Sequence, residues 1–259
     1  MPASPPSSLL ANAGTILVLT GAGMSAESGV PTFRGAEGLW RSFRPEQLAT
    51  PQAFARDPRL VWEWYRWRRE RVASCRPNPG HLALAHWMLA RSGVTLATQN
   101  VDGLHEAAAR EAAGPLGDPG RALPLRLHGS LFGVRCTACP HRAESRQPVG
   151  TGDRDGLPRC PDCHALLRPD VVWFGEPLPE AELGQAYAAA AGAEVCLVIG
   201  TQGAVYPAAD LAVAAQRAGA RLIVVDPGAT AFDSLADVRL VAKAGEVLPE
   251  LLRELHGGQ

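Results

Sequence analysis

The sequence has almost no excess charge of either sign. Its 259 residues include 25 Lys and Arg against 26 Asp and Glu, which gives a formal net charge of -1 at pH 7. A protein that binds nucleic acid or an anionic membrane through charge needs a basic excess or a basic stripe. We therefore expect no direct nucleic-acid partner and no membrane partner.

Long apolar runs and a leader segment are also missing. Even the alanine-rich stretch from Ala181 to Gly200 carries Glu182 and Glu194, so no segment offers the roughly 18 to 20 uncharged residues that a membrane span needs. Residues 1–11 are rich in Pro and Ser and have no basic region before an apolar run. We expect them to form a flexible tail of a cytoplasmic protein, with no signal peptide.

Short apolar, β-branched runs are present, and each is followed by a segment of helical character. Such runs are typical of parallel strands that helices cover on both faces. Helices are expected over residues 78–93, ending at Gly93, and 206–220, with Pro207 near the first turn and Gly219 after the last. The pattern predicts an α/β fold with a doubly wound, Rossmann-like parallel sheet. Strands are expected at Thr15–Thr20, Val94–Thr98, Leu123–His128, Val195–Gly200 and Arg221–Asp226.

Two insertions interrupt this core and are expected to form a small domain. Residues 34–78 contain four of the six tryptophans and the basic run RWRRER, and predict a helical module. Residues 131–169 contain two cysteine pairs around a polar stretch, which predicts a zinc module with a mobile loop. The Rossmann-like domain then comprises residues 12–33, 79–130 and 170–256. The four tryptophans are Trp40, Trp62, Trp64 and Trp67.

A glycine-rich stretch, LTGAGMSAESGVPTFRG, contains the end of the first predicted strand. Gly21, Gly23 and Ala26 match the pattern G-x-G-x-x-G/A, in which glycines allow a tight turn and backbone amides meet phosphates. Alone, the pattern fits a strand-to-helix turn packed with small residues equally well. Pro31 and Phe33 break the helix that a hydride-transferring dehydrogenase would have here. We expect a loop that lies over a cofactor.

Four of the six cysteines form two CxxC pairs separated by twenty residues. Two such pairs in a reducing compartment are better explained as thiolate ligands of one Zn²⁺ than as disulfides. Four protein ligands leave no open position, so the zinc is expected to be structural. A zinc ribbon that binds nucleic acid would need basic and aromatic surface around the knuckles, which is missing. The expected ligands are Cys136, Cys139, Cys160 and Cys163, while Cys75 and Cys196 are expected to fill core space.

Polar side chains follow two of the predicted strands. TQNVDGLH places Gln99, Asn100 and Asp102 after one strand, and LHGS places His128 after another. Ligands of an α/β sheet bind beyond the carboxyl ends of its strands. Each residue could singly be a helix cap or a turn residue. Their expected convergence with the glycine loop favours a ligand site with His128 as general base.

Two later strands end in the same way. GTQGAVYPAAD leaves its strand through Gly200 and Thr201, and the following strand ends at Asp226. An acid at that place can accept a hydrogen bond from a ribose hydroxyl. A turn residue before Pro227 explains Asp226 equally well.

Taken together, GAGMSAESGVPTFRG, TQNVDGLH, LHGS, the paired CxxC spacing, VVWFGE and GTQGAVYPAAD resemble the sirtuins, which are NAD-dependent protein lysine deacylases. The resemblance runs from about Thr15 to the C-terminus and keeps the order of the motifs. It implies a large Rossmann-like domain and a small zinc-and-helix domain. NAD as co-substrate and the acylated lysine side chain of a protein or peptide would meet in the cleft between them.

The resemblance implies a reaction and its residues. The acyl oxygen attacks C1′ of the NAD ribose as nicotinamide leaves, and His128 then takes a ribose hydroxyl proton so that the sugar attacks the acyl carbon. Asn100 and Asp102 assist at the nicotinamide pocket. Water completes the reaction, and the products are free lysine, nicotinamide and O-acyl-ADP-ribose. The implied cofactor contacts are Gly21, Ala22, Gly23, Ser25, Ala26, Pro31, Phe33, Arg34, Trp40, Gln99, Asn100, Asp102, Gly200, Thr201, Gln202, Asp226 and Ala244.

The stretch VVWFGE resembles the sirtuin strand that takes the substrate peptide as an added strand through main-chain hydrogen bonds. A buried core strand that ends in a glycine turn would suit Val171 and Trp173 equally well, and both interpretations can hold on alternate faces. The residues implied in peptide binding are Val172, Phe174, Gly175, Glu176 and, on a loop opposite, Val205.

The acyl group is suggested by Tyr65 and Arg68, which lie three apart on one face of a predicted helix. They match the Tyr-x-x-Arg pair of sirtuins that remove succinyl and malonyl groups, because a guanidinium can fork onto a distal carboxylate. Ala49 stands where many deacetylases of the family have Phe, which widens the pocket. We predict a desuccinylase and demalonylase that retains deacetylase activity. A solvated basic face is expected for the other arginines, Arg66, Arg69 and Arg71.

Two positions depart from the sirtuin pattern: Gln202 replaces the usual Ser and Asp226 the usual Asn. Both departures bear on NAD affinity more than on chemistry. Alternatives that stay open are a mono-ADP-ribosyltransferase or NAD glycohydrolase on the same scaffold, and an NAD-sensing binding module. The sequence carries no signal for protein targets or for an oligomeric state.

Overall fold

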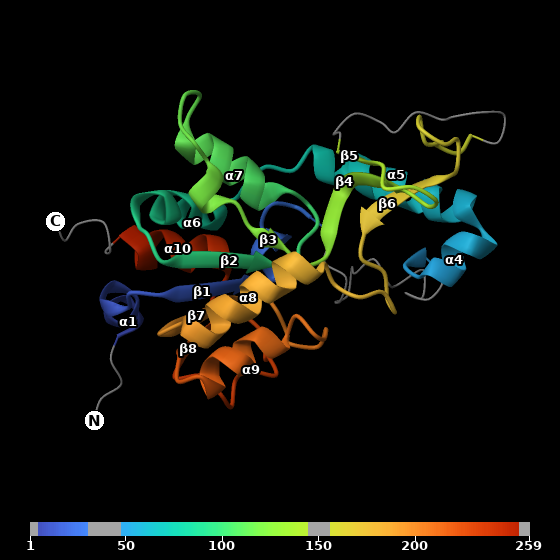
Figure 1. Ribbon diagram of the computed structural model, residues 1–259. Coiled ribbons are helices and arrows are strands. Elements are labelled where there is room, and N and C mark those ends of the chain that lie inside the picture. The colour runs from blue at the N-terminus through green and yellow to red at the C-terminus, as the bar shows by residue number, and fades with distance from the viewer. Residues whose placement is uncertain (1–4, 31–47, 145–155, 254–259) are drawn as a thin grey trace.

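A computed structural model describes residues 5–30, 48–144 and 156–253 of the chain. Two sheets organise it (Figure 1). The larger has six strands in the order β3-β2-β1-β7-β8-β9, and the smaller has three in the order β5-β4-β6. The order of the larger sheet, with the crossover between β1 and β7, is that of a dinucleotide-binding fold. The predicted fold class, a doubly wound α/β core with a small added module, is therefore confirmed.

All strand pairs of the large sheet are parallel. The central strands β1 and β7 are buried at every residue, because helices cover both faces of the sheet. Four of the five predicted strands agree with the structure to within one residue at either end. The strands are β1 (Ile16–Thr20), β2 (Val94–Thr98), β3 (Leu125–Arg126), β7 (Val195–Ile199), β8 (Arg221–Val225) and β9 (Val238–Leu240).

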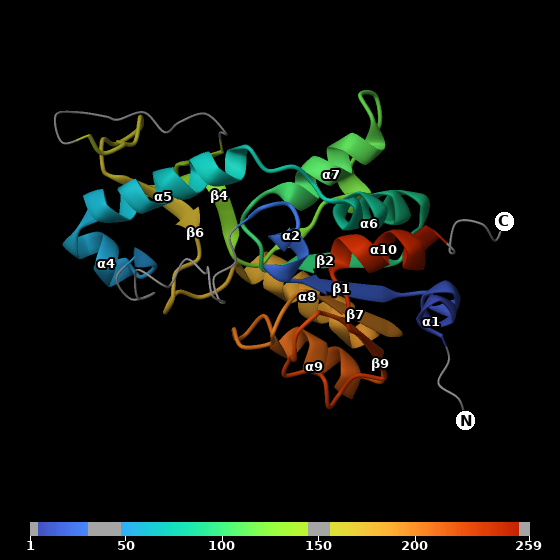
Figure 2. The same cartoon turned by 180° about the vertical axis from the view of Figure 1, so that it is seen from behind.

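Helices α6 (Pro79–Ala90), α7 (Leu104–Ala113) and α10 (Ala244–Arg253) cover one face of the large sheet, and α8 (Glu180–Gly192) and α9 (Asp210–Arg217) cover the other (Figures 1 and 2). Two further short helices of this part are α2 (Gly23–Ala26) and η2 (Gly120–Ala122). Helix α6 begins where Asn78 Oδ1 accepts hydrogen bonds from the amides of Gly80 and His81 at 3.0 and 3.2 Å.

The flexible tail expected over residues 1–11 is wrong from Pro6 onward. Helix α1 (Pro6–Asn12) begins with a proline in its first turn and buries Leu10 completely against the core. Arg91 fastens its end by donating from Nη1 to the Leu10 carbonyl at 3.0 Å. Leu9 packs against the same core, so both leucines of this helix contact the body of the protein. No helix in the described ranges is both long and apolar enough to cross a membrane.

The small module packs around a separate core. Strands β4 (Gly129–Cys136), β5 (Arg142–Glu144) and β6 (Leu167–Val171) are antiparallel and lie beside α4 (Pro51–Arg56) and α5 (Pro58–Ala73). Figure 1 shows this module at one end of the large sheet. Its core contains Trp62, Trp64, Tyr65, Phe132 and Trp173.

The basic run on α5 does not form the solvated face that we expected. Arg71 is exposed, but Arg66 is half-buried and donates to the Gly156 carbonyl at 2.7 Å. Arg69 is buried, donates to the Leu131 carbonyl at 3.2 Å and lies over the Phe132 ring. The expectation failed for Arg69 because a guanidinium can be buried where carbonyl oxygens and an aromatic face receive it.

Candidate active site

The glycine loop packs main chain against main chain at the crossover of the large sheet. Gly21 N donates to the Ile199 carbonyl at 3.0 Å, and Gly23 N donates to the Gly200 carbonyl at 2.8 Å. A Cβ on Gly23 would lie 2.7 Å from Gly200 Cα, and Gly200 itself has φ +61°. Only glycine fits this approach. Helix α2 has only four residues, so a loop rather than a long helix follows the glycines.

The end of β2 joins this loop to the end of β7. Gln99 Nε2 donates to Thr201 Oγ1 at 3.1 Å. Asn100 Nδ2 donates to the Gly21 carbonyl at 2.9 Å and to Ser25 Oγ at 3.2 Å. An amide nitrogen has two protons, so both are used and Oδ1 is the atom of this amide that remains to receive a ligand. The structure therefore brings together the polar residues predicted at this rim.

Asp102 is buried, with 5% of its surface exposed, at the start of α7. Its Oδ1 accepts from Leu104 N at 2.9 Å, so it caps the helix as well as lying at the rim. Burial raises the pKa of Asp102, although hydrogen bonds from Leu104 and Ser25 oppose the shift. The positive charge of Arg68 also lowers the pKa of Asp102, and this interaction means that α5 lies close to the Asp102 carboxylate.

Ser25 is completely buried behind Asn100, and its hydroxyl is fully engaged. His81 Nδ1 accepts from Asn78 N at 3.4 Å, so the ring proton is on Nε2, which lies 3.4 Å from Ser25 Oγ. Ser25 thus accepts from His81 and Asn100, and its hydroxyl also acts to lower the pKa of Asp102. The hydroxyl supports Asn100 from behind, a contact that the sequence pattern did not indicate.

His128 lies between β3 and β4, where the two sheets meet, and is half-buried. Its Nδ1 lies 2.9 Å from the Gln99 carbonyl oxygen. A carbonyl only accepts, so Nδ1 carries the proton and Nε2 of the neutral ring is left as an acceptor. Burial lowers the pKa of His128 below its ordinary value, although the bond to Gln99 opposes this. The ring is thereby held neutral in the tautomer that a general base needs.

The stretch VVWFGE is not the strand that we expected. Strand β6 ends at Val171, and Gly175, with φ +87°, forms a turn in which Glu176 N donates to the Trp173 carbonyl at 3.0 Å. Val172 N donates to the His128 carbonyl at 3.0 Å. Trp173 is buried while Phe174 is half exposed, so the alternation between a core face and an outer face is confirmed.

Glu176 explains why this run ends on an acid. Its Oε2 accepts from Trp173 N and from Arg168 Nη2, each at 2.9 Å, and its Oε1 accepts from Arg135 Nη2 at 3.0 Å. Burial opposes ionisation, but the Arg168 and Trp173 hydrogen bonds lower the pKa of Glu176 overall. The side chain closes the turn through these bonds, and the contact of Glu176 with a substrate peptide stays a prediction.

The predicted acyl residues lie together beneath this turn. Tyr65 is buried, and its hydroxyl accepts from Trp173 Nε1 at 2.9 Å. Arg68 is also buried, with its guanidinium over the rings of Trp64 and Tyr65. Ala49 contributes its carbonyl, which accepts from Phe174 N at 2.9 Å. Burial raises the pKa of Tyr65 and lowers that of Arg68, although each partially offsets the shift of the other.

The residues predicted at the far end of the cofactor lie on the β7–β8 side of the crossover. Asp226 Oδ1 accepts from Gly228 N at 2.8 Å, which is the turn contact of the alternative explanation. Gln202 is exposed, and Ala244 is buried at the start of α10. Val205, which was predicted to contact the substrate peptide, is half-buried. The other predicted cofactor contacts differ in burial: Gly21 and Thr201 are buried, Ala22 and Gly23 are half-buried, and Ala26 is exposed. The remaining predicted contacts, Pro31, Phe33, Arg34 and Trp40, lie outside the described residues.

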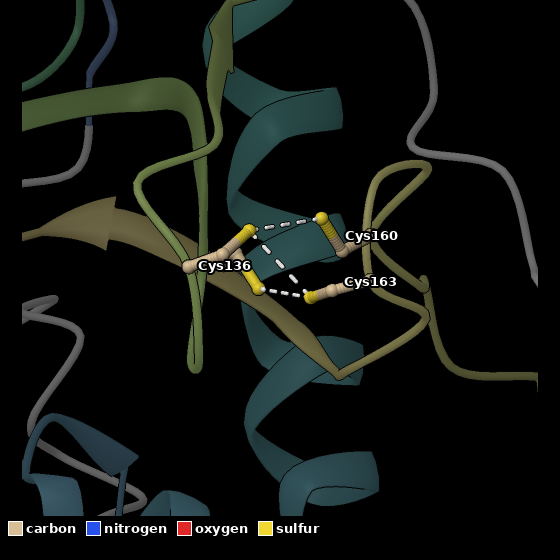
Figure 3. A group of neighbouring side chains, drawn as sticks. Cys136, Cys160 and Cys163 are labelled. Atoms are coloured by element: carbon tan, nitrogen blue, oxygen red, sulfur yellow. Dashed lines mark hydrogen bonds between the residues drawn. The ribbon is translucent and has the colours of Figure 1, made fainter.

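The four paired cysteines converge in the small module, and Figure 3 labels three of them, Cys136, Cys160 and Cys163. Their Sγ atoms all lie within 4.8 Å of one another, with separations of 3.4 Å from Cys136 to Cys163 and 3.5 Å from Cys139 to Cys160. Zn–S bonds of about 2.3 Å in a tetrahedron require sulfur separations of about 3.8 Å. The cluster therefore fits a structural Zn²⁺ with no open position. Cys75 and Cys196 are buried apart from it, as expected.

Comparison with known proteins bears on this geometry. The family model described as "Sir2 family" matches residues 21–207. The chain belongs to the Sir2 family. Relatives named "NAD-dependent protein deacylase" include one from Pyrococcus furiosus, 48% identical over 253 residues that cover 96% of each chain. One from Aquifex aeolicus is 44% identical and covers 94% of this chain and 98% of its own.

Solved structures of Sir2 proteins agree. A Sir2 homologue in complex with NAD has a TM-score of 0.84 and 43% identity, covering 96% of this chain and 92% of its own. A Sir2 protein bound to acetylated peptide has a TM-score of 0.79 and 26% identity, covering 95% of both chains. The resemblance to sirtuins that the sequence predicted is therefore confirmed, and with it the fold.

Two buried residues of this Sir2 site were missed by sequence reasoning, His81 and His105. Asn78 with His81 three residues later has the spacing of a capping box and could have placed His81 in the first turn of α6. Nothing in the sequence indicated that α6 and α7 would place the ring centroids of the two imidazoles 4.8 Å apart. That contact depends on helix packing and not on a local pattern.

Proposed function

We propose that this protein is an NAD-dependent protein-lysine deacylase that transfers the acyl group to ADP-ribose and releases nicotinamide. The observation that carries the proposal is the fixed tautomer of His128. Its Nδ1 donates to Gln99, so Nε2 is a bare acceptor beside the rim formed by Asn100 and the glycine loop. NAD supplies a ribose carbon that becomes electrophilic as nicotinamide leaves, with hydroxyls that a neutral imidazole can deprotonate.

The glycine loop and the strand ends would hold the dinucleotide. Close backbone packing of Gly21 and Gly23 on Gly200 leaves a main-chain floor at the crossover, where dinucleotides bind in such sheets. Asn100 offers Oδ1 at the chemical end. Asp226 would accept from a ribose hydroxyl through its second carboxylate oxygen, since the first is held by Gly228 N.

His128 would do its work at Nε2 while Nδ1 stays bonded. On taking a ribose hydroxyl proton, the ring becomes an imidazolium whose Nδ1–H still donates to the Gln99 carbonyl. The ring therefore need not move during proton transfer. The buried position favours return of the proton, because burial penalises the charged ring.

The acylated peptide would lie on the outer side of the turn that follows β6. Val172 and Phe174 present partly exposed side chains there, and Gly175 has no side chain to obstruct a neighbouring main chain. Most amide protons of the turn are already used internally, so a peptide would pair with the Val172 carbonyl and the Gly175 amide. Val205, before α9, would lie on the opposite side.

The preferred acyl group would be acidic. Tyr65 accepts from Trp173 Nε1 and keeps its own hydroxyl proton, which can be donated to a carboxylate. Arg68 supplies a buried positive charge close to Asp102 and hence to the cofactor rim. Ala49, whose carbonyl bonds Phe174 N, has only a methyl side chain and so leaves room for a larger acyl group. These contacts support succinyl and malonyl groups as preferred substrates, with acetyl groups accepted more slowly.

The experiment mixes the protein with NAD and matched acetyl-lysine and succinyl-lysine peptides, and follows peptide mass and nicotinamide together. Removal of the acyl group, coupled one to one with nicotinamide release and lost in His128→Ala, is the expected result. Nicotinamide release that ignores the peptide would replace the proposal with an NAD glycohydrolase or ADP-ribosyltransferase. NAD binding without turnover would replace it with a binding module.

A further inference from the structure

Two buried histidines lie behind the rim and take no part in the proposed reaction. His81 on α6 and His105 on α7 are 0% and 3% exposed. Burial lowers the pKa of His81 to about 4, and burial together with His81 lowers the pKa of His105 well below its ordinary value. Both rings are therefore neutral, and each carries a single ring proton.

A chain of buried hydroxyls leads from His105 to the rim. Thr20 Oγ1, at the end of β1, lies 3.0 Å from His105 Nε2 and donates to Thr98 Oγ1 at 2.8 Å. A threonine hydroxyl has one proton. Since Thr20 gives that proton to Thr98, it must accept from His105, and the ring proton of His105 is therefore on Nε2.

The chain ends at the main chain of Asn100. Thr98 Oγ1 accepts from Asn100 N at 3.1 Å, in addition to the bond from Thr20. Thr20 and Thr98 are 0% and 2% exposed, so water does not compete for these bonds. The main-chain position of Asn100 in turn sets the direction of its side chain, whose two amide protons are held by Gly21 and Ser25.

We infer that His105 is a positioning residue of this site: through Thr20 and Thr98 it fixes Asn100, so that Asn100 Oδ1 stays available at the chemical end of the dinucleotide. The opposite tautomer of His105 would accept at Nε2 and turn the Thr20 hydroxyl away from Thr98. Thr98 Oγ1, the atom that accepts from Asn100 N, would then lose the bond donated by Thr20 that helps to hold it in place. The ligand assigned to Asn100 rests on the proposed function, whereas the chain of hydrogen bonds does not.

The first test reads the hydrogen bonds directly by NMR on the full ¹⁵N-labelled chain. The ring nitrogens of His105 should show the Nε2–H tautomer. The main-chain and side-chain amide signals of Asn100 should move in Thr20→Val and in His105→Phe. Thr15→Val, which removes a hydroxyl bonded to the Gly192 carbonyl at the other end of β1, should leave them in place. An Nδ1–H tautomer, or Asn100 signals that do not respond to Thr20→Val, would overturn the inference.

The second test is kinetic and separates positioning from packing. His105→Phe and Thr20→Val should lower kcat for peptide-dependent nicotinamide release by about tenfold or more, because a displaced contact group is costly. KM for the acyl peptide should stay within about twofold, since Asn100 would contact the dinucleotide. His105→Gln, which keeps a donor, should recover most of kcat, and Thr15→Val should match the wild type.

If the loss of kcat were proportional to the loss of thermal stability in all four variants, including Thr15→Val, His105 would be only a packing residue. Failure of the wild type to release nicotinamide would contradict the proposed function instead. The NMR result would still decide the role of His105, because it needs neither substrate nor turnover.

Discussion

Arg126, in the edge strand β3 of the large sheet, donates from Nη1 to Oε2 of Glu144 in the small module at 2.9 Å. The same guanidinium pairs through Nε with Glu106 of α7, which is 6% exposed. Ser130 Oγ donates to the other Glu144 oxygen at 2.8 Å. One cation thus joins the two sheets two residues before His128, and this geometry links stability to the site.

Replacing Arg126 by Met should lower the free energy of unfolding by about 2 kcal/mol, because the buried Glu106 loses a charged hydrogen-bond partner. Urea denaturation measures the change. The matched control is Arg221→Met, which breaks the more exposed ion pair between Arg221 and Asp237 and should cost about 0.5 kcal/mol or less. Equal losses of unfolding free energy in the two variants would show that burial does not make the Arg126–Glu106 ion pair more stabilising than an exposed one.

Acid should loosen the same junction. Burial raises the pKa of Glu144, but the bonds from Arg126 and Ser130 outweigh it and lower that pKa overall. A carboxyl whose folded pKa is depressed stabilises the fold fully above its unfolded value, about 4.3, and loses this contribution as pH falls through the folded pKa. Unfolding free energy measured from pH 6 down to about 3 should therefore fall less steeply in Glu144→Gln than in the wild type. Parallel curves would contradict the assignment.

The pH dependence of turnover should report His128. Its base form is the neutral ring, and burial lowers the pKa, so activity should persist to lower pH than an ordinary histidine allows. The acid limb of kcat/KM for NAD is expected to have an apparent pKa below about 6.5. The bond to His128 Nδ1 comes from the main-chain carbonyl of Gln99 and not from its side chain. A limb above 6.5 would argue against His128 as the base.

Acyl preference should depend on Arg68. Arg68→Met removes a charged hydrogen-bond donor, and the succinyl-to-acetyl ratio of kcat/KM should fall by about 30-fold, which corresponds to about 2 kcal/mol. Arg71→Met on the exposed face of the same helix is the control and should leave the ratio unchanged. Competition between the two acyl peptides in one tube, followed by mass, gives the ratio directly. An unchanged ratio in Arg68→Met would remove the acidic-acyl assignment.

Zinc should be required for the small module. Atomic absorption is expected to find one zinc per chain, and a strong chelator should lower the melting temperature, because metal binding by four thiolates is coupled to folding. Cys163→Ser should lose the metal, whereas Cys75→Ser, outside the cluster, should keep it. Full zinc content in Cys163→Ser would show that the cluster is not the metal site.

The parts of the fold that could be predicted are those that local pattern determines. Strands β1, β2, β7 and β8 are apolar runs because both faces are covered, and α6 begins directly after its cap, Asn78. The cysteine spacing indicated its site because two CxxC knuckles converge in few ways. The residues at the strand ends could be grouped because parallel strands end at one edge of a sheet.

The parts that could not be predicted depend on tertiary contacts. Strand β4 contains two glycines, and its pairing with β6 shifts register between Gly129 and Val134, which hides the alternation of a strand. Strand β9 has three residues, all half-buried. Arg69 looked like a surface charge because the carbonyl that receives it, that of Leu131, lies 62 residues away in sequence.

Under the proposed function, the two cores of the molecule separate recognition of the acyl group from the reaction. Gly21, Gly23 and Gly200 form a floor on the large sheet that tolerates no side chain. Tyr65, Arg68 and Ala49 belong to the aromatic core of the small module or lie in its helix. Mutations can therefore accumulate in the second set without disturbing the first. The preference for one acyl group over another is therefore the property that can change most easily during evolution. Exchanging helix α5 together with residue 49 is the smallest change of sequence by which this preference could be moved from one relative to another.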